Sequence, residues 1–99
     1  MKIQYTRSAG LPGMLRSCEL DTAALPADLA LRLKDLVDKS GFDKSIELVD
    51  PKGRDKQQFT LRIKRRGKAI DVTIDASQVP ETARALLKLL DEHAKPGLP

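Results

Sequence analysis

Aromatic residues are scarce in this chain of 99 residues, which contains Tyr5, Phe42 and Phe59 and no tryptophan. Its core must therefore be mainly aliphatic. The single cysteine, Cys18, has no second cysteine with which to form an internal disulfide. No apolar run approaches the roughly 20 residues that a membrane-spanning helix needs, and the N-terminus lacks the apolar segment of a secretory signal. These absences predict one domain over residues 1–99, built around one core, which we expect in the cytoplasm.

Groupings of residues that support catalysis or metal binding are also missing. The sequence has no HExxH pair of a zinc protease, and His93 and Cys18 cannot complete a closed zinc site without other ligands. Only chain folding could pair Cys18 with His93, and Cys18 is more typical of a small buried side chain. Four acidic residues are spaced as outward-facing residues rather than as a converging pair: Asp35, Asp38, Asp71 and Asp75. We therefore predict no enzymatic activity, no metal site and no cofactor.

Basic residues are concentrated in one segment. The formal net charge is +4, but residues 52–68 hold eight basic residues and one acidic residue, a local charge of +7 that leaves −3 for the rest. Such a one-sided field can steer an acidic protein or a nucleic acid, although a basic run is more often only a solvated hairpin. Five of its residues are our candidates for electrostatic guidance of a partner: Arg62, Lys64, Arg65, Arg66 and Lys68.

Apolar periodicity predicts a hairpin and then a helix in the first part of the chain. Ile3 and Tyr5 share one face of a strand, and Cys18 and Leu20 share one face of a returning strand. A helix over 26–40 follows, because an apolar stripe at helical spacing begins after a proline and stops at a serine–glycine pair.

The second hairpin has the best-defined register. Arg66-Gly67 suits a two-residue turn between two segments in which apolar and polar residues alternate. This turn sets three apolar pairs on one face, namely Ile63 with Ile70, Leu61 with Val72 and Phe59 with Ile74. It also places Arg62 opposite Asp71 on the solvent face. A slip of one residue would move every apolar side chain to the wrong face.

The remaining segments complete the predicted fold. Residues 42–56 include Ile46–Val49, which could form a short strand or pack as a loop, and we expect an irregular connection. A leucine-rich helix over 80–94 follows the second hairpin, and residues 96–99 should form a loose tail. We predict an α+β fold of order ββαββα, in which a four-stranded antiparallel sheet is covered on one face by both helices.

Several sequence blocks, in their order, resemble those of the emfourin family. They are Lys2-Ile-Gln-Tyr-Thr-Arg-Ser, Leu20-Asp-Thr-Ala-Ala-Leu-Pro26, Leu36-Val-Asp38, Gly41-Phe42, the second hairpin and the Val79-Pro80 entry into the last helix. Each block is common alone, but their order is fairly specific and covers most of the chain. Emfourins are protein inhibitors of thermolysin-like metalloproteases. The resemblance therefore implies a bacterial protein that inhibits such a protease by binding tightly at its active-site cleft.

The first turn is our candidate protease-binding loop, made of Ser8, Ala9, Gly10, Leu11, Pro12, Gly13 and Met14. The resemblance implies a target that favours a bulky aliphatic side chain just after the cleaved bond, which Gly10-Leu11 offers. Pro12 follows directly, and its fixed φ and missing N–H would hinder productive extension through the cleft. The alternative is a plain hairpin turn in which Leu11 covers the edge of the core.

The leading hypothesis is a monomeric inhibitor whose partner is a thermolysin-like metalloprotease and which does not bind a membrane. The alternative is a small basic module that binds RNA or another acidic partner. The outward positions of the second hairpin carry no aromatic residue on which bases could stack, so nucleic acid is not the expected partner. A mode that contacts only phosphates stays open and would be strongly salt-dependent.

Overall fold

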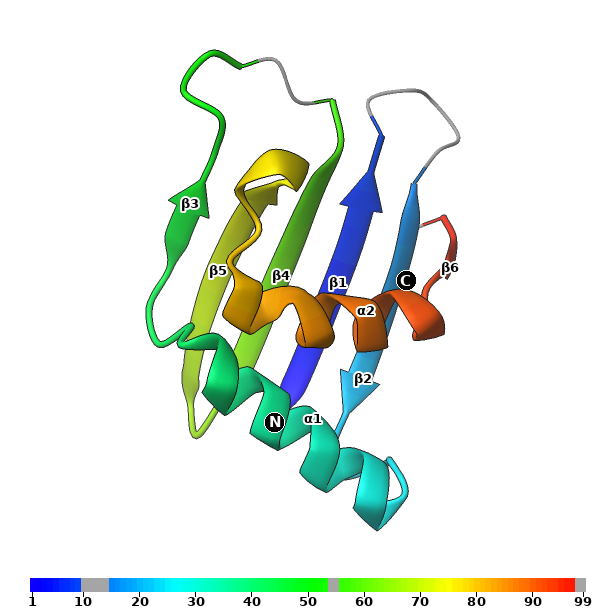
Figure 1. Cartoon of the computed structure of the whole chain (residues 1–99). Helices are drawn as coiled ribbons and strands as arrows, with labels where there is room; N and C mark the ends of the chain where they lie inside the picture. Colours follow the sequence, from blue (N-terminus) through cyan, green and yellow to red (C-terminus); the bar gives the residue numbers. More distant parts are fainter. Residues whose placement is uncertain (10–14, 54–55, 98–99) are drawn as a thin grey trace.

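A computed structural model, which describes residues 1–9, 15–53 and 56–97, shows one mixed β-sheet with two α-helices across one face (Figure 1). The strand order within the described residues is β3-β5-β4-β1-β2-β6. The strands are β1 (Lys2–Ser8), β2 (Arg16–Asp21), β3 (Ile46–Leu48), β4 (Gln58–Arg65), β5 (Lys68–Asp75) and β6 (Lys95–Pro96). The helices are α1 (Ala27–Ser40) and α2 (Arg84–His93), with 3-10 turns at Ala76–Gln78 and Glu81–Ala83.

The predicted register of the second hairpin is confirmed. The three apolar pairs are as expected: Ile63 with Ile70, Leu61 with Val72 and Phe59 with Ile74. Arg62 lies opposite Asp71 on the solvent face, and its Nη1 is 3.2 Å from Asp71 Oδ1. Both turn residues have positive φ, 50° at Arg66 and 75° at Gly67, as a two-residue type I′ turn requires.

The fold is α+β as predicted, but the predicted order ββαββα with four antiparallel strands is wrong in detail, because it omits β3 and β6. β3 pairs in parallel with β5, with Ile46 opposite Val72, and β6 pairs with β2 at the other edge. Ser45 supports the β3 pairing, because its Oγ accepts a hydrogen bond from the Asp71 N–H at 2.9 Å. β3 has only three residues and a partner distant in sequence, so its periodicity was too short to distinguish a strand from a loop.

The predicted loose tail over 96–99 is wrong for its described part, because Pro96 and Gly97 are attached to the edge of the sheet. Pro96 lies opposite Arg16, and the Gly97 N–H donates to Leu15 O at 2.9 Å. The Ser17 hydroxyl also donates to Gly97 O. β2 would otherwise be an edge with unpaired backbone groups, and a short strand satisfies some of them. Residues 98–99 lie outside the described part of the chain.

Both predicted helices are present with small differences at their starts. α1 begins at Ala27 and ends at Ser40, and it is followed by Gly41, whose φ of 78° is a left-handed conformation that glycine adopts without strain. The predicted 80–94 helix begins with the 3-10 turn and becomes α-helical at Arg84. The stripes face the sheet as predicted, and their most buried members are Leu33, Val37, Leu86 and Leu90.

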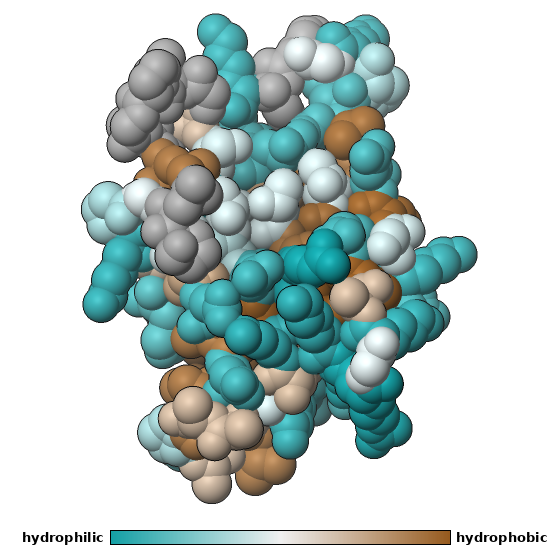
Figure 2. All heavy atoms as spheres, turned by 180° about the vertical axis from the view of Figure 1, so that it is seen from behind, coloured by the Kyte–Doolittle hydropathy of each residue, from teal (hydrophilic) through white to brown (hydrophobic). Residues whose placement is uncertain are grey.

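The helices cover the apolar face of the sheet and leave the other face to solvent. The core is aliphatic apart from Tyr5, which is fully buried and stacks against Phe59 with ring centroids 6.4 Å apart. The described strand residues that face solvent are mostly polar and include no aromatic residue. Figure 2 views this face, which is mostly teal and white. Its central hollow, of about 290 Å³, is lined by threonine, glutamine and the Arg62–Asp71 pair.

Candidate protein-binding surface

Three chain connections begin or end at one end of the sheet. Ser8, at the end of β1, pairs with Gln58 at the start of β4, and Gln58 pairs with Asp75 at the end of β5. We call this end, with the flanking residues that the structure describes, the loop end (Figure 1). Ser8 and Ala9 of the candidate loop belong to it, whereas Gly10, Leu11, Pro12, Gly13 and Met14 lie outside the described residues.

Asp75 fixes the backbone at the loop end. It is only 6% exposed, and its carboxylate accepts hydrogen bonds from the Asp50 N–H at 2.6 Å and from Gln58 Nε2 at 3.0 Å. Asp75 lies on the same side of β5 as the outward-facing Asp71, but the prediction that it is an exposed residue was wrong, because the Asp50 backbone that follows β3 packs against its carboxylate. One carboxylate thereby ties the β3–β4 connection to the ends of β4 and β5.

Four of the five candidate guidance residues lie around the opposite end of the sheet, where Lys2 pairs with Lys64, whereas Arg62 lies nearer the middle of β4. Arg62 forms an ion pair with Asp71, and Arg65 Nη2 is 2.9 Å from Asp38 Oδ1. Lys68 Nζ donates to Asp43 O at 3.4 Å. Within the described residues, Lys64, Arg66 and Lys68 form no ion pair with a carboxylate, so they are the main source of net positive charge at this end.

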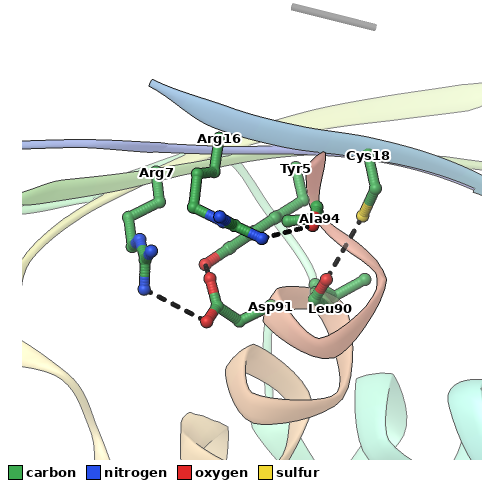
Figure 3. Close-up of polar contacts among 7 residues, drawn as sticks. All are labelled: Tyr5, Arg7, Arg16, Cys18, Leu90, Asp91 and Ala94. Atoms are coloured by element: carbon green, nitrogen blue, oxygen red, sulfur yellow. Dashed lines mark hydrogen bonds and ion pairs between the residues drawn. The ribbon is translucent and has the colours of Figure 1, made fainter. Parts of the chain in front are cut away.

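A partly buried polar cluster joins β1 to α2 near the loop end (Figure 3). Asp91 on α2 accepts a hydrogen bond from the Tyr5 hydroxyl at 3.0 Å and pairs with Arg7 Nη1 at 3.1 Å. Burial, and then the hydrogen bond to Asp91, raise the pKa of Tyr5 well above its usual value, so the phenol stays protonated and donates. The cluster holds α2 at a fixed position along β1.

Arg16 on β2 points to the same side of the sheet as Arg7 (Figure 3). The two arginines are directly opposed across β1 and β2, as the last pair before the candidate loop. Arg16 Nη2 donates to Ala94 O at 2.8 Å, just beyond the C-terminus of α2, where the helix dipole favours a cation. Sequence analysis missed this pair, although Arg7 and Arg16 are in phase with the buried Tyr5 and Cys18.

Cys18 and His93 line one hollow of about 590 Å³ beside β6, yet their chemistry does not support catalysis. The thiol is buried and donates to Leu90 O at 3.4 Å, and burial raises the pKa of Cys18 to about 11. A nucleophilic cysteine needs a lowered pKa and a nearby base. His93 Nδ1 is instead 3.0 Å from Leu89 O. The prediction that Cys18 serves as a small buried side chain is confirmed.

A second hollow, of about 390 Å³, lies at the loop end between β4, the segment after β5 and α2. Phe59, Val79 and Leu87 provide its apolar lining, and Arg84 contributes a positive charge. This surface is suited to an apolar side chain from a partner, accompanied by a negative group.

Two features are absent from the residues that the structure describes. No group of three or more His, Cys, Asp or Glu side chains there is arranged to hold a metal ion. Neither described helix combines the length and apolar character needed to cross a membrane.

Comparison with known proteins identifies the family. Neither the curated proteins nor the solved structures include a match. The Emfourin family model, however, matches residues 8–91, which is most of the chain. The chain therefore belongs to the emfourin family, and this membership implies the role of a metalloprotease inhibitor rather than that of an enzyme.

Proposed function

We propose that this protein inhibits a thermolysin-like zinc metalloprotease by occupying its active-site cleft. Membership of the emfourin family is the observation that carries the proposal. The loop end supports it, because several connections there leave adjacent strands and could enter one cleft together. Inhibition then needs no catalytic group on this chain, only a surface that fits the cleft and is not released as product.

The proposed cleft-binding segment is Ser8–Met14, with Leu11 as its anchor. The Gly10-Leu11 bond offers the aliphatic side chain that such a protease favours, and Pro12 hinders productive extension. The flanking strands pair up to Arg7 and Arg16, and these residues are bonded to Asp91 on α2 and to Ala94 O just beyond it. Because both ends of the segment are held in this way, its binding costs less conformational entropy than the binding of an ordinary peptide.

The turn between β4 and β5, which we call the basic turn and which includes Lys64, Arg66 and Lys68, has a different role from that of the loop end. Lys64, Arg66 and Lys68 lie roughly 20 Å from the loop end, given the rise per residue along β4. At that separation they do not contact the same cleft. We assign them to long-range attraction of an acidic protease, an effect on the association rate rather than on the lifetime of the complex.

The test is titration of the purified protein against a thermolysin-like protease with a peptide substrate. Leu11→Ser should weaken inhibition by about 2 kcal/mol if Leu11 is a hot spot, while thermal stability changes little. Leu31→Ser is the matched control, because Leu31 lies on α1 and is 68% exposed. It should inhibit as the wild type does.

Unaltered inhibition by Leu11→Ser would show that Leu11 is not the anchor. The contact would then move first to the segment 75–80 and next to residues 42–56, both of which have parts at the loop end. Absence of inhibition by the wild-type protein against every thermolysin-like protease tested would contradict the proposed function itself.

A further inference from the structure

Two arginines face each other at the base of the candidate loop with too little negative charge to compensate them. Arg7 and Arg16 are Cα partners in the β1–β2 pairing, and like charges directly opposite each other destabilise a sheet. Among the described residues, Asp91 is the one carboxylate that pairs with either of them. Both Asp91 oxygens are already engaged, one by Tyr5 and one by Arg7.

Within the part of the chain that the structure describes, both guanidinium groups keep unused donors. Each guanidinium has five N–H groups, whereas Arg7 donates to Asp91 Oδ2 and Arg16 donates to Ala94 O. The Arg7 side chain is 29% exposed, so a partner can reach it while its stem stays packed. Two partly buried guanidinium groups with free donors form a site suited to a carboxylate, which arginine binds in a bidentate manner.

The apolar hollow at the loop end adjoins this pair. Arg7 is the register partner of Phe59 on β4, and Phe59 lines the hollow. On α2, Asp91 and Leu87 are four residues apart and lie on the same side of the helix, and Leu87 lines the hollow as well. The positive site and the apolar site are therefore neighbours on one surface.

We infer that Arg7 and Arg16 clamp a carboxylate side chain of the target protease, and that the adjoining hollow takes an apolar residue next to it. This inference rests on the proposed function and adds a second contact beside the cleft-binding segment. Binding of the carboxylate relieves the repulsion between the two arginines, which strengthens the complex relative to the free inhibitor. The clamp thereby selects proteases that carry an acidic residue beside the cleft.

The test compares two variants that remove the same charge from opposite ends of the sheet. Arg16→Gln removes one arm of the clamp without unpairing Asp91, and Arg66→Gln removes an exposed charge at the basic turn. Arg16→Gln should raise the dissociation rate from the protease by about tenfold or more, because it leaves a desolvated carboxylate with one partner. Arg66→Gln should leave that rate unchanged.

A second variant separates binding from folding. Arg16→Lys keeps the positive charge near Ala94 O but lacks the planar fork, so it should retain the wild-type melting temperature and still dissociate faster. An acidic-to-amide change at the matching residue of the protease should cause no further loss when combined with Arg16→Gln.

The outcomes for the clamp and for the proposed function differ. Wild-type inhibition together with equal dissociation rates for Arg16→Gln, Arg16→Lys and Arg66→Gln would overturn the clamp and leave the proposed function intact. Failure of the wild-type protein to inhibit would overturn both.

Discussion

At the scale of single residues, two aspartates on this sheet show that burial decides what a carboxylate does. Asp71 and Asp75 lie on the same strand and on the same side of it. The Asp71 side chain is 62% exposed and pairs with Arg62, whereas Asp75 is buried and binds a backbone N–H and an amide. An exposed ion pair is screened by water and contributes little to stability. If a buried acceptor is removed, its donors are left without a hydrogen-bond partner, which costs free energy.

Removal of the Asp75 carboxylate should therefore destabilise the protein. We expect Asp75→Ala to lower the free energy of unfolding by about 1–3 kcal/mol, because the Asp50 N–H and the Gln58 amide lose their acceptor. The measurement is urea unfolding followed by circular dichroism. Asp71→Ala is the control and should cost no more than about 1 kcal/mol. Equal losses for the two variants would contradict the assigned role of Asp75.

At the scale of elements, the turn and the residue alternation of the β4–β5 hairpin specify the same register as its packing against the rest of the protein. Alternation along both strands sets the buried face, and the positive φ values of the turn match the twist of the strands. Arg66, with φ of 50°, is the one position where the residue type does not suit the conformation, because a left-handed backbone is strained for most side chains.

Replacement of Arg66 by asparagine should relieve that strain. Arg66→Asn creates the Asn-Gly pair that type I′ turns favour, and we expect a gain of roughly 0.5–1 kcal/mol in the free energy of unfolding. Arg66→Gln removes the charge without the conformational advantage and should give no gain. Gly67→Ala should cost about 1 kcal/mol from strain alone, since an added Cβ meets no atom within 4 Å. Thermal unfolding distinguishes the three, and a gain in Arg66→Gln equal to that in Arg66→Asn would show that charge is the cause.

Some elements could be predicted from sequence because their signals are local. The helices have stripes at helical spacing with a proline or glycine at their ends, and the hairpin register follows from alternation and turn length. β3 and β6 lack such signals, having three and two residues. Each is a strand only because an edge of the sheet is close enough to pair with it, and that edge is built from residues elsewhere in the chain.

At the scale of the whole molecule, positive charge occurs in two places with different surroundings. The arginines at the loop end are partly buried and directly opposed, and Lys64, Arg66 and Lys68 lie at the far end without a carboxylate partner in the described part of the chain. Charges that contact a partner affect mainly the dissociation rate of the complex, whereas distant charges affect mainly its association rate.

Neutralisation of the basic turn should therefore slow association with an acidic protease. We expect the triple change Lys64→Gln, Arg66→Gln and Lys68→Gln to lower the association rate at low salt and to leave the dissociation rate unchanged. The difference should shrink at about 0.5 M salt, because screening then acts over only a few ångströms. Arg65 is kept, since it pairs with Asp38. Stopped-flow inhibition kinetics provide the measurement.

The same variant also tests the alternative function. If the basic turn only attracts an acidic protein, RNA should bind weakly and lose most of its affinity by about 0.2 M salt. Tight, salt-resistant and sequence-selective RNA binding that the triple change abolishes would favour a nucleic-acid-binding module over a protease inhibitor.

The sequence by itself determined the fold class, the two helices, the hairpin register and the resemblance to the emfourins, because periodicity, turn residues and motif order are properties of neighbouring positions. Only the tertiary structure decided that Asp75 is buried, that β3 and β6 complete the sheet, and that Arg7, Arg16 and Asp91 meet beside an apolar hollow. These features depend on which distant segments approach each other, and a side chain's burial and partners exist only once the helices have packed onto the sheet.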